Sequence, residues 1–245
     1  MKQLVVNADD FGLCSEVNRA VIQANQQGIL TAASLMIAAP AAKEAVALAK
    51  ANPKLKVGLH FICVDGFGLL SQKPFSSNLI WAGVRYFFSP AWRRRLKEEL
   101  TAQMEAYLET GLVCDHLNAH NHFHLHPVVR KIVMNLAQRH KIRKIRWPSP
   151  APLSRALKKK LDAAGLTRND HTFGLKETGR MTEEAWLKQI PQIRDGMTEA
   201  YCHPAVSSSP ATEKWLKNYN CVEEFKALVS PRVKGALQEA RIRLC

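Results

Sequence analysis

Titratable side chains stand directly after several short apolar runs of this 245-residue sequence. They are Asp9, Asp10, His60, His120, Arg146 and His203. Carboxylates and imidazoles bind divalent metals and exchange protons near neutral pH. If each apolar run is a strand of a parallel sheet, these groups meet at its carboxyl edge, where active sites of such proteins lie. The sequence therefore predicts a catalytic centre assembled from strand ends.

One carboxylate and two histidines from this set could hold a divalent metal with open positions for water and substrate. Iron-dependent oxygenases use the same three ligand types, so the ligand set alone does not fix the reaction. Here one aspartate and one histidine remain after the ligands are assigned. A spare base and a spare acid are what hydrolysis requires, because water must lose a proton and a leaving amine must gain one. Read alone, Asp9-Asp10 could equally be a cap before the helix expected at Val17.

Histidines recur at every second position in one stretch of the chain. The even positions are His116, Asn118, His120, His122, His124 and His126. A period of two places these side chains on one face if the segment stays extended. An exposed strand face, or a surface patch that binds metal adventitiously, would show the same pattern. Because the whole chain has nine histidines, this density favours a functional role.

The charge of the chain is strongly positive. Thirty-five Lys and Arg face 21 Asp and Glu, which gives a net charge of +14 and a pI near 9.7. The excess is concentrated between Arg130 and Lys160 and again at Arg93, Arg94, Arg95 and Lys97. Such a balance suits nucleic acid, an anionic membrane face or a charged substrate, although solvated helix faces give the same pattern.

Composition and cysteine usage restrict the class of protein. The 47% hydrophobic content is typical of a globular protein with a sizeable core. Six cysteines without a C-x-x-C pair suit a reducing compartment. The longest weakly polar stretch, from Ile29 to Ala42, is shorter than a membrane span. We therefore expect a cytoplasmic protein without a transmembrane helix, with residues 1–245 forming one domain.

Apolar runs alternate with helical patterns along the chain, which is typical of a parallel sheet with crossover helices. The expected strands cover 4–8, 34–38, 57–62, 114–119, 142–146, 198–202 and 227–229. The expected helices follow Val17 and cover 40–51, 90–110, 128–139, 155–164 and 183–189, with a last helix after Pro231. Residues 63–88 carry several aromatics and are predicted to be irregular. A (β/α) barrel of about seven strands is expected, with an open doubly wound sheet as the alternative.

Four motifs, in this order, resemble the YdjC-like carbohydrate deacetylases. They are Val-Asn-Ala-Asp-Asp-Phe-Gly at 6–12, Gly-Leu-His at 58–60, Asp-His-Leu-Asn-Ala-His at 115–120 with its histidine-rich tail, and Cys-His-Pro-Ala at 202–205. Together they reach from the start of the chain to about residue 205. The resemblance implies a distorted β/α barrel and removal of an acetyl group from an N-acetylated amino sugar.

The resemblance also assigns roles to the strand-end residues. It implies one divalent metal ion, zinc or magnesium, held by Asp10, His60 and His120, and two histidine ligands favour zinc. Asp9 would be the catalytic base, His203 the catalytic acid, and Arg146 the residue that orients the base. His122, His124 and His171 would contact substrate or support the ligands.

Three further segments resemble the HpnK group of this family, which is associated with hopanoid biosynthesis. They are Arg-Tyr-Phe-Phe-Ser-Pro at 85–90, Asn-Asp-His-Thr-Phe-Gly-Leu at 169–175 and Met-Thr-Glu-Glu at 181–184. That resemblance implies an N-acetylglucosaminyl hopanoid as substrate. Aromatics from Trp81 to Trp92, followed at once by Arg93, suit peripheral contact with an anionic membrane at its inner face. Core packing under a long loop would explain the same aromatics.

Other functions stay open from the sequence. A soluble chitooligosaccharide would suit the same catalytic groups. A metal-dependent phosphoesterase would suit the positive charge, but a two-metal cluster usually needs more carboxylates than one strand-end pair. A basic module that only binds nucleic acid or membrane would leave the strand-end residues unexplained, and no specific nucleic-acid partner is expected.

Overall fold

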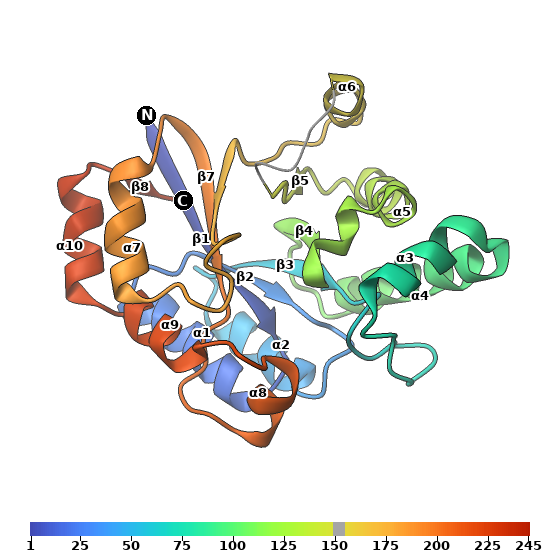
Figure 1. Cartoon of the computed structure of the whole chain (residues 1–245), viewed down its shortest axis with the longest axis horizontal. Coiled ribbons are helices and arrows are strands. Elements are labelled where there is room, and N and C mark those ends of the chain that lie inside the picture. The colour runs from blue at the N-terminus through green and yellow to red at the C-terminus, as the bar shows by residue number, and fades with distance from the viewer. Residues whose placement is uncertain (149–154) are drawn as a thin grey trace.

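The chain folds around one curved sheet of parallel strands that carries helices on its outer side (Figure 1). The structure is a computed structural model that describes residues 1–148 and 155–245. Seven strands follow the order β5-β4-β3-β2-β1-β7-β6, and β8 pairs with the start of β1. The Ile145 amide donates to the Thr167 carbonyl at 3.0 Å, so the two ends of the curved sheet approach each other. The predicted barrel is confirmed as a half-barrel of seven parallel strands.

The strands have the following bounds: β1 Lys2–Phe11, β2 Ala32–Leu35, β3 Lys56–Phe61, β4 His116–Ala119, β5 Lys144–Ile145, β6 His171–Phe173, β7 Gly196–Cys202 and β8 Arg243–Leu244. Central strands are buried along most of their length, because parallel strands are covered on both faces. Leu4, Val6, Ala8, Leu59 and Phe61 are all fully buried. Burying a leucine or phenylalanine contributes about 1.5–3 kcal/mol, so these strands form a rigid base for the site.

The helices are α1 Ser15–Gln27, α2 Ala42–Ala51, α3 Leu79–Phe88, α4 Pro90–Glu109, α5 Pro127–Arg139, α6 Arg155–Ala163, α7 Glu183–Gln189, α8 Pro210–Trp215, α9 Cys221–Leu228 and α10 Pro231–Glu239, with 3-10 turns η1 His120–Leu125 and η2 Ile190–Gln192. The helix predicted after Ser89-Pro90 is confirmed as α4. The Ser89 hydroxyl caps it by accepting from the Trp92 amide, and Leu96, Leu100 and Met104 pack inward.

Two predictions about local structure are wrong, and one stated condition is not met. Residues 63–88 are not wholly irregular, because 79–88 form α3, which Asn78 caps by accepting from the Trp81 amide. Residues 227–229 are not a strand, since α9 runs to Leu228. The histidine run does not stay extended, because it turns into η1 with Asn121 and His122 in the left-handed region.

Two features of the outer surface bear on partners. No helix among residues 1–148 and 155–245 is long and apolar enough to cross a membrane. The basic stretch 130–160 divides between α5, β5 and the start of α6, and its residues 149–154 lie outside the described part of the chain. α3 and α4 project together from one side of the sheet (Figure 1).

Candidate metal centre and catalytic site

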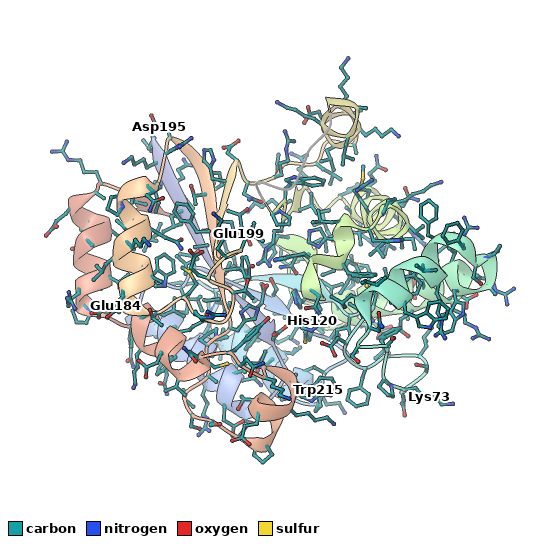
Figure 2. The ribbon with its side chains drawn as sticks, in the orientation of Figure 1. Lys73, His120, Glu184, Asp195, Glu199 and Trp215 are labelled. Atoms are coloured by element: carbon teal, nitrogen blue, oxygen red, sulfur yellow. The ribbon has the colours of Figure 1, made fainter. Side chains whose placement is uncertain are left out.

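The strand register brings the predicted residues to one edge of the sheet. Ala8 pairs with Cys202, so Asp9 and His203 each follow a paired position on neighbouring strands. His60 pairs with Asn118, and His120 begins η1 directly after β4. In Figure 2, His120 lies in the interior by these strand ends, whereas Asp195 marks the opposite end of β7. The predicted assembly of a site from strand ends is what the fold provides.

A bulge in β1 turns two consecutive aspartates towards the site. The β1–β2 register shifts between Ala8 and Phe11, and Asp10 has a φ of 61°. In a regular strand, neighbouring side chains point to opposite faces, so Asp9 and Asp10 could not both face the centre. A left-handed aspartate within a strand is strained, and such strain is typical of functional positions.

Asp10, His60 and His120 form a compact group of metal-ligand type. The Asp10 Oδ1 atom lies 3.3 Å from His60 Nε2 and 3.2 Å from His120 Nδ1. One ligand atom from each residue lies within 4.8 Å of the other two, and no other such group was found among the described residues. Both Asp10 oxygens are buried, and neither receives a hydrogen bond within the described part of the chain. Buried acceptors without donors are the arrangement that a bound cation would satisfy.

The charge of this buried cluster also fits a divalent ion. Asp9, Asp10 and Glu199 are buried carboxylates, and Arg146 is the buried cation among them. They leave two negative charges uncompensated if the histidines are neutral. Burial alone would raise the pKa of Asp10, but nearby His120 and His60 hold that pKa well below the usual range. Uncompensated charge inside a protein is costly, so a doubly charged cation would balance the set.

Arg146 clamps Asp9 in one orientation. Its two terminal nitrogens donate to the two Asp9 oxygens at 2.5 Å and 2.8 Å, and its Nε donates to Glu199 at 2.6 Å. Burial would raise the pKa of Asp9, but the charge and hydrogen bonds of Arg146, together with the charges of His60 and His203, outweigh burial and hold the pKa well below the ordinary value. Asp9 is therefore ionised at neutral pH and fixed in direction. Sequence reasoning missed Glu199, although a charged residue inside the predicted strand 198–202 was a usable signal.

His203 follows β7 and is supported by a second residue that sequence reasoning missed. Glu224 of α9 is fully buried, and it accepts hydrogen bonds from the backbone amides of His203 and Met181. Its Oε2 atom lies 4.0 Å from His203 Nδ1. Burial raises the pKa of Glu224. No sequence signal identified Glu224, because its segment was predicted to precede a strand that does not exist.

A cavity of about 140 Å³ opens between these groups. It is lined by Asp9, His60, Leu79, His120, Asn121, His122, Thr178, Tyr201, His203 and Tyr219. The Tyr219 ring centre lies 4.8 Å from that of His203, and Tyr201 lies 4.9 Å from His122. The cavity thus joins the expected ligands, the clamped aspartate and His203 with two tyrosines that the sequence did not single out.

The three residues predicted to contact substrate lie in different surroundings from one another. His122 lines the cavity, and burial together with Arg146 holds its pKa well below the ordinary value. His124 is fully buried, accepts from the Ala119 amide and contacts the Arg146 carbonyl through its other nitrogen, so both ring nitrogens are engaged within the protein. His171 pairs with Thr198, which pairs with Leu4, so the register places it near the amino-terminal end of the strands, away from Asp9.

Two relatives found by comparison with known proteins carry the same description, carbohydrate deacetylase. The chain is 32% identical over 244 residues to a carbohydrate deacetylase of Geobacillus stearothermophilus, covering 98% of this chain and 94% of that one. It is 33% identical over 249 residues to a carbohydrate deacetylase of Vibrio campbellii, covering 97% and 92%.

Solved structures share the fold. A candidate cellobiose-phosphate cleavage protein of Enterococcus faecalis matches with a TM-score of 0.79 at 21% identity, over 100% of this chain and 97% of that one. A lactam utilization protein of Thermus thermophilus matches with a TM-score of 0.55 at 15% identity, over 99% and 98%. The family model described as YdjC-like protein matches residues 3–239, and the chain belongs to this YdjC-like family.

Proposed function

We propose that this protein is a metal-dependent hydrolase that removes the acetyl group from an N-acetylated amino sugar, with residues 1–245 acting as one unit. The observation that carries the proposal is the group of buried Asp10 and His60 with half-buried His120. Beside it lie Asp9, which Arg146 clamps, and His203, whose Nδ1 makes no hydrogen bond within the described residues. Relatives over 30% identical along nearly the whole chain are named carbohydrate deacetylases, which supports the same activity here.

Asp10, His60 and His120 would hold one divalent ion, and their two nitrogens and one oxygen favour zinc over magnesium. When bound, such an ion acidifies water and polarises the amide carbonyl. Asp10 and His60 are buried, which strengthens the electrostatic interactions at this end of the cavity.

Asp9 would accept the proton of the attacking water. It lines the cavity beside His60 and His120, and its low pKa keeps it ionised and ready to accept at neutral pH. Arg146 fixes the carboxylate with two hydrogen bonds, and Glu199 fixes Arg146. A base that is already held in one orientation loses less conformational entropy when it reaches its reactive geometry.

His203 would donate a proton to the departing amine. Its Nδ1 is buried and makes no hydrogen bond within the described residues, and the nearest acid is Glu224 at 4.0 Å. His203 and Asp9 both line the cavity, so base and acid face a common space.

We propose a lipid-linked amino sugar, such as an N-acetylglucosaminyl hopanoid, as the substrate. The support lies in α3, whose first residue Leu79 lines the site cavity while Ala82 and Tyr86 line a second cavity of about 440 Å³. That second cavity also contains Phe75 and Trp92. Seven helical residues span about 10 Å, so a sugar at the metal group and an apolar aglycone in the second cavity would fit one molecule.

The outer face of α3 supports peripheral contact with an anionic membrane, at its inner face in a cytoplasmic protein. Ile80 is 82% exposed and Phe88 is 73% exposed, and Phe87 lies beside them. Arg85 stacks on Trp81 and on Trp92, with its guanidinium carbon about 5 Å from each ring centre. Apolar rings beside arginines match the boundary between acyl chains and phosphate headgroups.

A soluble chitooligosaccharide is the second candidate substrate, and a different cavity favours it. A groove of about 420 Å³ is lined by Ser207, Ser208, Asn218, Asn220 and other residues of the segment 207–223. Tyr219 lines both this groove and the site cavity, so the two are neighbours. Hydroxyls, amides and an aromatic ring are the groups that bind further sugar units.

One experiment separates these possibilities. Acetate release is measured from an acetylated chitooligosaccharide and from a lipid-linked N-acetylglucosamine, and phosphate release from a phosphate monoester, each with and without chelator. We expect chelator-sensitive acetate release, faster on the lipid-linked sugar. Release of phosphate without acetate would replace the proposal with a phosphoesterase, and no release of either would replace it with a binding protein.

A further inference from the structure

A chain of buried hydrogen bonds runs from the metal-ligand group through the sheet towards its opposite end. His60 Nδ1 lies 2.6 Å from Asn118 Oδ1, and Asn118 Nδ2 donates to Ser34 Oγ at 2.8 Å. Ser34 Oγ lies 2.9 Å from His116 Nε2, whose Nδ1 lies 3.2 Å from Asp115. The chain links strands β3, β4 and β2. Beyond His60, its one contact with a residue of the proposed chemistry among the described residues is the Asn118 amide, which also donates to Asp9 Oδ1 at 3.4 Å.

The far end of this chain is charged and reaches another cavity. Lys144 donates to the second Asp115 oxygen at 2.7 Å, and both residues line a cavity of about 190 Å³ that does not include Asp9 or Asp10. Burial would raise the pKa of Asp115, but His116 and Lys144 hold it well below the ordinary value. Asp115 is thus a permanent acceptor at the end of the chain.

With the Asn118 oxygen facing His60, counting donors and acceptors gives the chain one direction. Ser34 Oγ accepts from Asn118 and also from Asn7 at 2.9 Å, so its own proton is free to point at His116 Nε2. A neutral His116 then carries its proton on Nδ1 and donates it to Asp115. At the near end, Asn118 Oδ1 accepts the Nδ1 proton of His60, which leaves His60 Nε2 as a lone pair facing Asp10.

The reverse direction is the competing arrangement. With the Asn118 amide turned over, its oxygen would accept from Ser34 at 2.8 Å and from Arg146 at 3.1 Å, and its nitrogen would donate to His60 Nδ1. His60 would then carry its proton on Nε2, where it would block a metal. A neutral His116 would also present a lone pair to Asp115, so two acceptors would face each other at 3.2 Å.

We propose that Asp115 is a positioning residue for the metal centre, acting through His116, Ser34 and Asn118 to hold His60 as the tautomer that binds metal. Metal-bound histidines generally donate their second nitrogen to an acceptor, often a carboxylate, and here the carboxylate acts through three intermediate groups. Arg146 favours the Asn118 orientation in which the amide oxygen faces Arg146. Asp115 favours the opposite Asn118 orientation, because it accepts the Nδ1 proton of His116. The inference rests on the proposed metal site.

Gly58 leaves the space that the His116 ring of this hydrogen-bond chain occupies. A Cβ atom at Gly58 would lie 2.4 Å from the His116 carbonyl and 2.6 Å from its ring. A side chain there would displace the His116 ring from between Ser34 and Asp115. The Gly-Leu-His motif therefore carries both a ligand and the space in which its support packs.

Zinc affinity of the whole protein, measured by competition with a chromophoric chelator, tests the proposal in three variants. Asp115→Asn lets the new amide donate to His116 and favours the reverse chain, and Ser34→Ala breaks the chain. We expect each to weaken zinc binding by about tenfold, the lower range for groups that support metal ligands. Asp162→Asn is the control, because it removes a carboxylate that only pairs with Arg168 near the surface, and should leave affinity unchanged.

Nitrogen NMR of labelled histidines reads the direction of the chain itself. We expect His116 to be neutral with its proton on Nδ1 in the zinc-bound wild type and to change tautomer in Asp115→Asn. A His116 that is doubly protonated or protonated on Nε2 in the wild type would overturn the proposal. So would wild-type zinc affinity in folded Asp115→Asn and Ser34→Ala, or a wild type that binds no zinc. Zinc affinity and tautomer shifts as expected, without acetate release, would refute only the deacetylase activity.

Discussion

The strand-end site buries and pairs its charged side chains, whereas the projection formed by α3 and α4 leaves several of its arginines exposed. At the site, Arg146 is fully enclosed and donates along two edges of its guanidinium to the carboxylates of Asp9 and Glu199. In the projection, Arg93 and Arg95 are exposed and make no ion pair within the described residues, and Arg85 stacks on aromatic rings. Enclosed, paired charges hold geometry, whereas exposed, unpaired ones remain free to meet an external anion.

The two regions also differ in how completely their apolar side chains are buried. The strands below the site bury their apolar side chains completely, while α3 buries Ala82 and Tyr86 and exposes Ile80, Phe87 and Phe88. The site is therefore built for chemistry that depends on fixed positions. The projection is built to meet a partner, and the following changes should separate these two roles.

Removal of a ligand should have the largest effect. Asp10→Asn and His120→Ala each take one donor from a buried three-ligand group, so we expect loss of metal and a fall in turnover of about a thousandfold or more. Elemental analysis and acetate release measure the two effects. Asp195→Asn, at the opposite end of β7 and exposed, is the matched control and should change neither. Full metal occupancy in His120→Ala would remove it from the ligand set.

Asp9→Asn should show whether Asp9 acts as the catalytic base or as a metal ligand. The amide keeps the size of the side chain but cannot accept the water proton, so we expect metal to stay bound and turnover to fall about a hundredfold. The same metal analysis and acetate assay apply. Equal metal loss in Asp9→Asn and Asp10→Asn would show that the two aspartates share the ligand role.

His203→Ala should discriminate between leaving groups. An amine needs a proton to leave and a phenoxide does not, so we expect a fall of about a hundredfold on the amide and of less than about tenfold on an activated acetyl ester. The ratio of the two rates is the measurement. If the ester suffered as much as the amide, His203 would serve another step.

Changes on α3 should be smaller and should depend on substrate. Replacing Ile80, Phe87 and Phe88 by Ser removes exposed apolar surface only, so we expect about a tenfold loss on a lipid-linked sugar and weaker binding to anionic vesicles, with a soluble sugar unaffected. Val113→Ser is the control, because Val113 is 87% exposed and lies outside α3. Equal loss on both substrates would favour the soluble candidate.

Acid should remove the stability that Asp9 contributes to the folded protein. Because the folded pKa of Asp9 lies below its unfolded value near 3.8, its contribution to stability is complete above about pH 4 and is lost as the pH falls further. Denaturant unfolding at pH 6 and pH 3 measures the free energy of unfolding. We expect a smaller difference between the two pH values in Asp9→Asn, and an unchanged difference would mean that Arg146 does not stabilise Asp9.

The strand-end residues were predictable, and their supports were not. Short apolar runs followed by Asp9, His60 or His203 mark the edge of a parallel sheet without any knowledge of packing. α3 was missed because it is apolar on several faces, so no stripe with a period of 3.6 stands out. The histidine run was misjudged because Asn121 and His122 turn left-handed there, a tertiary choice that alternation does not reveal.

The supporting contacts that sequence reasoning did not foresee have one feature in common. Glu199, Glu224 and Asn118 act on partners 21 to 58 positions away in the chain, and only the folded structure shows those pairings. Spacing rules describe neighbours within one helix or strand, so they carry no information on such contacts.

Titration of the chelated protein with zinc tests the central claim most directly. Acetate release from an acetylated amino sugar is followed as zinc is added to a known concentration of protein. We expect activity to rise in proportion to zinc and to level off at one equivalent, because Asp10, His60 and His120 form a single group among the described residues. Acetate release that is indifferent to zinc, or that needs two equivalents, would contradict a one-metal deacetylase.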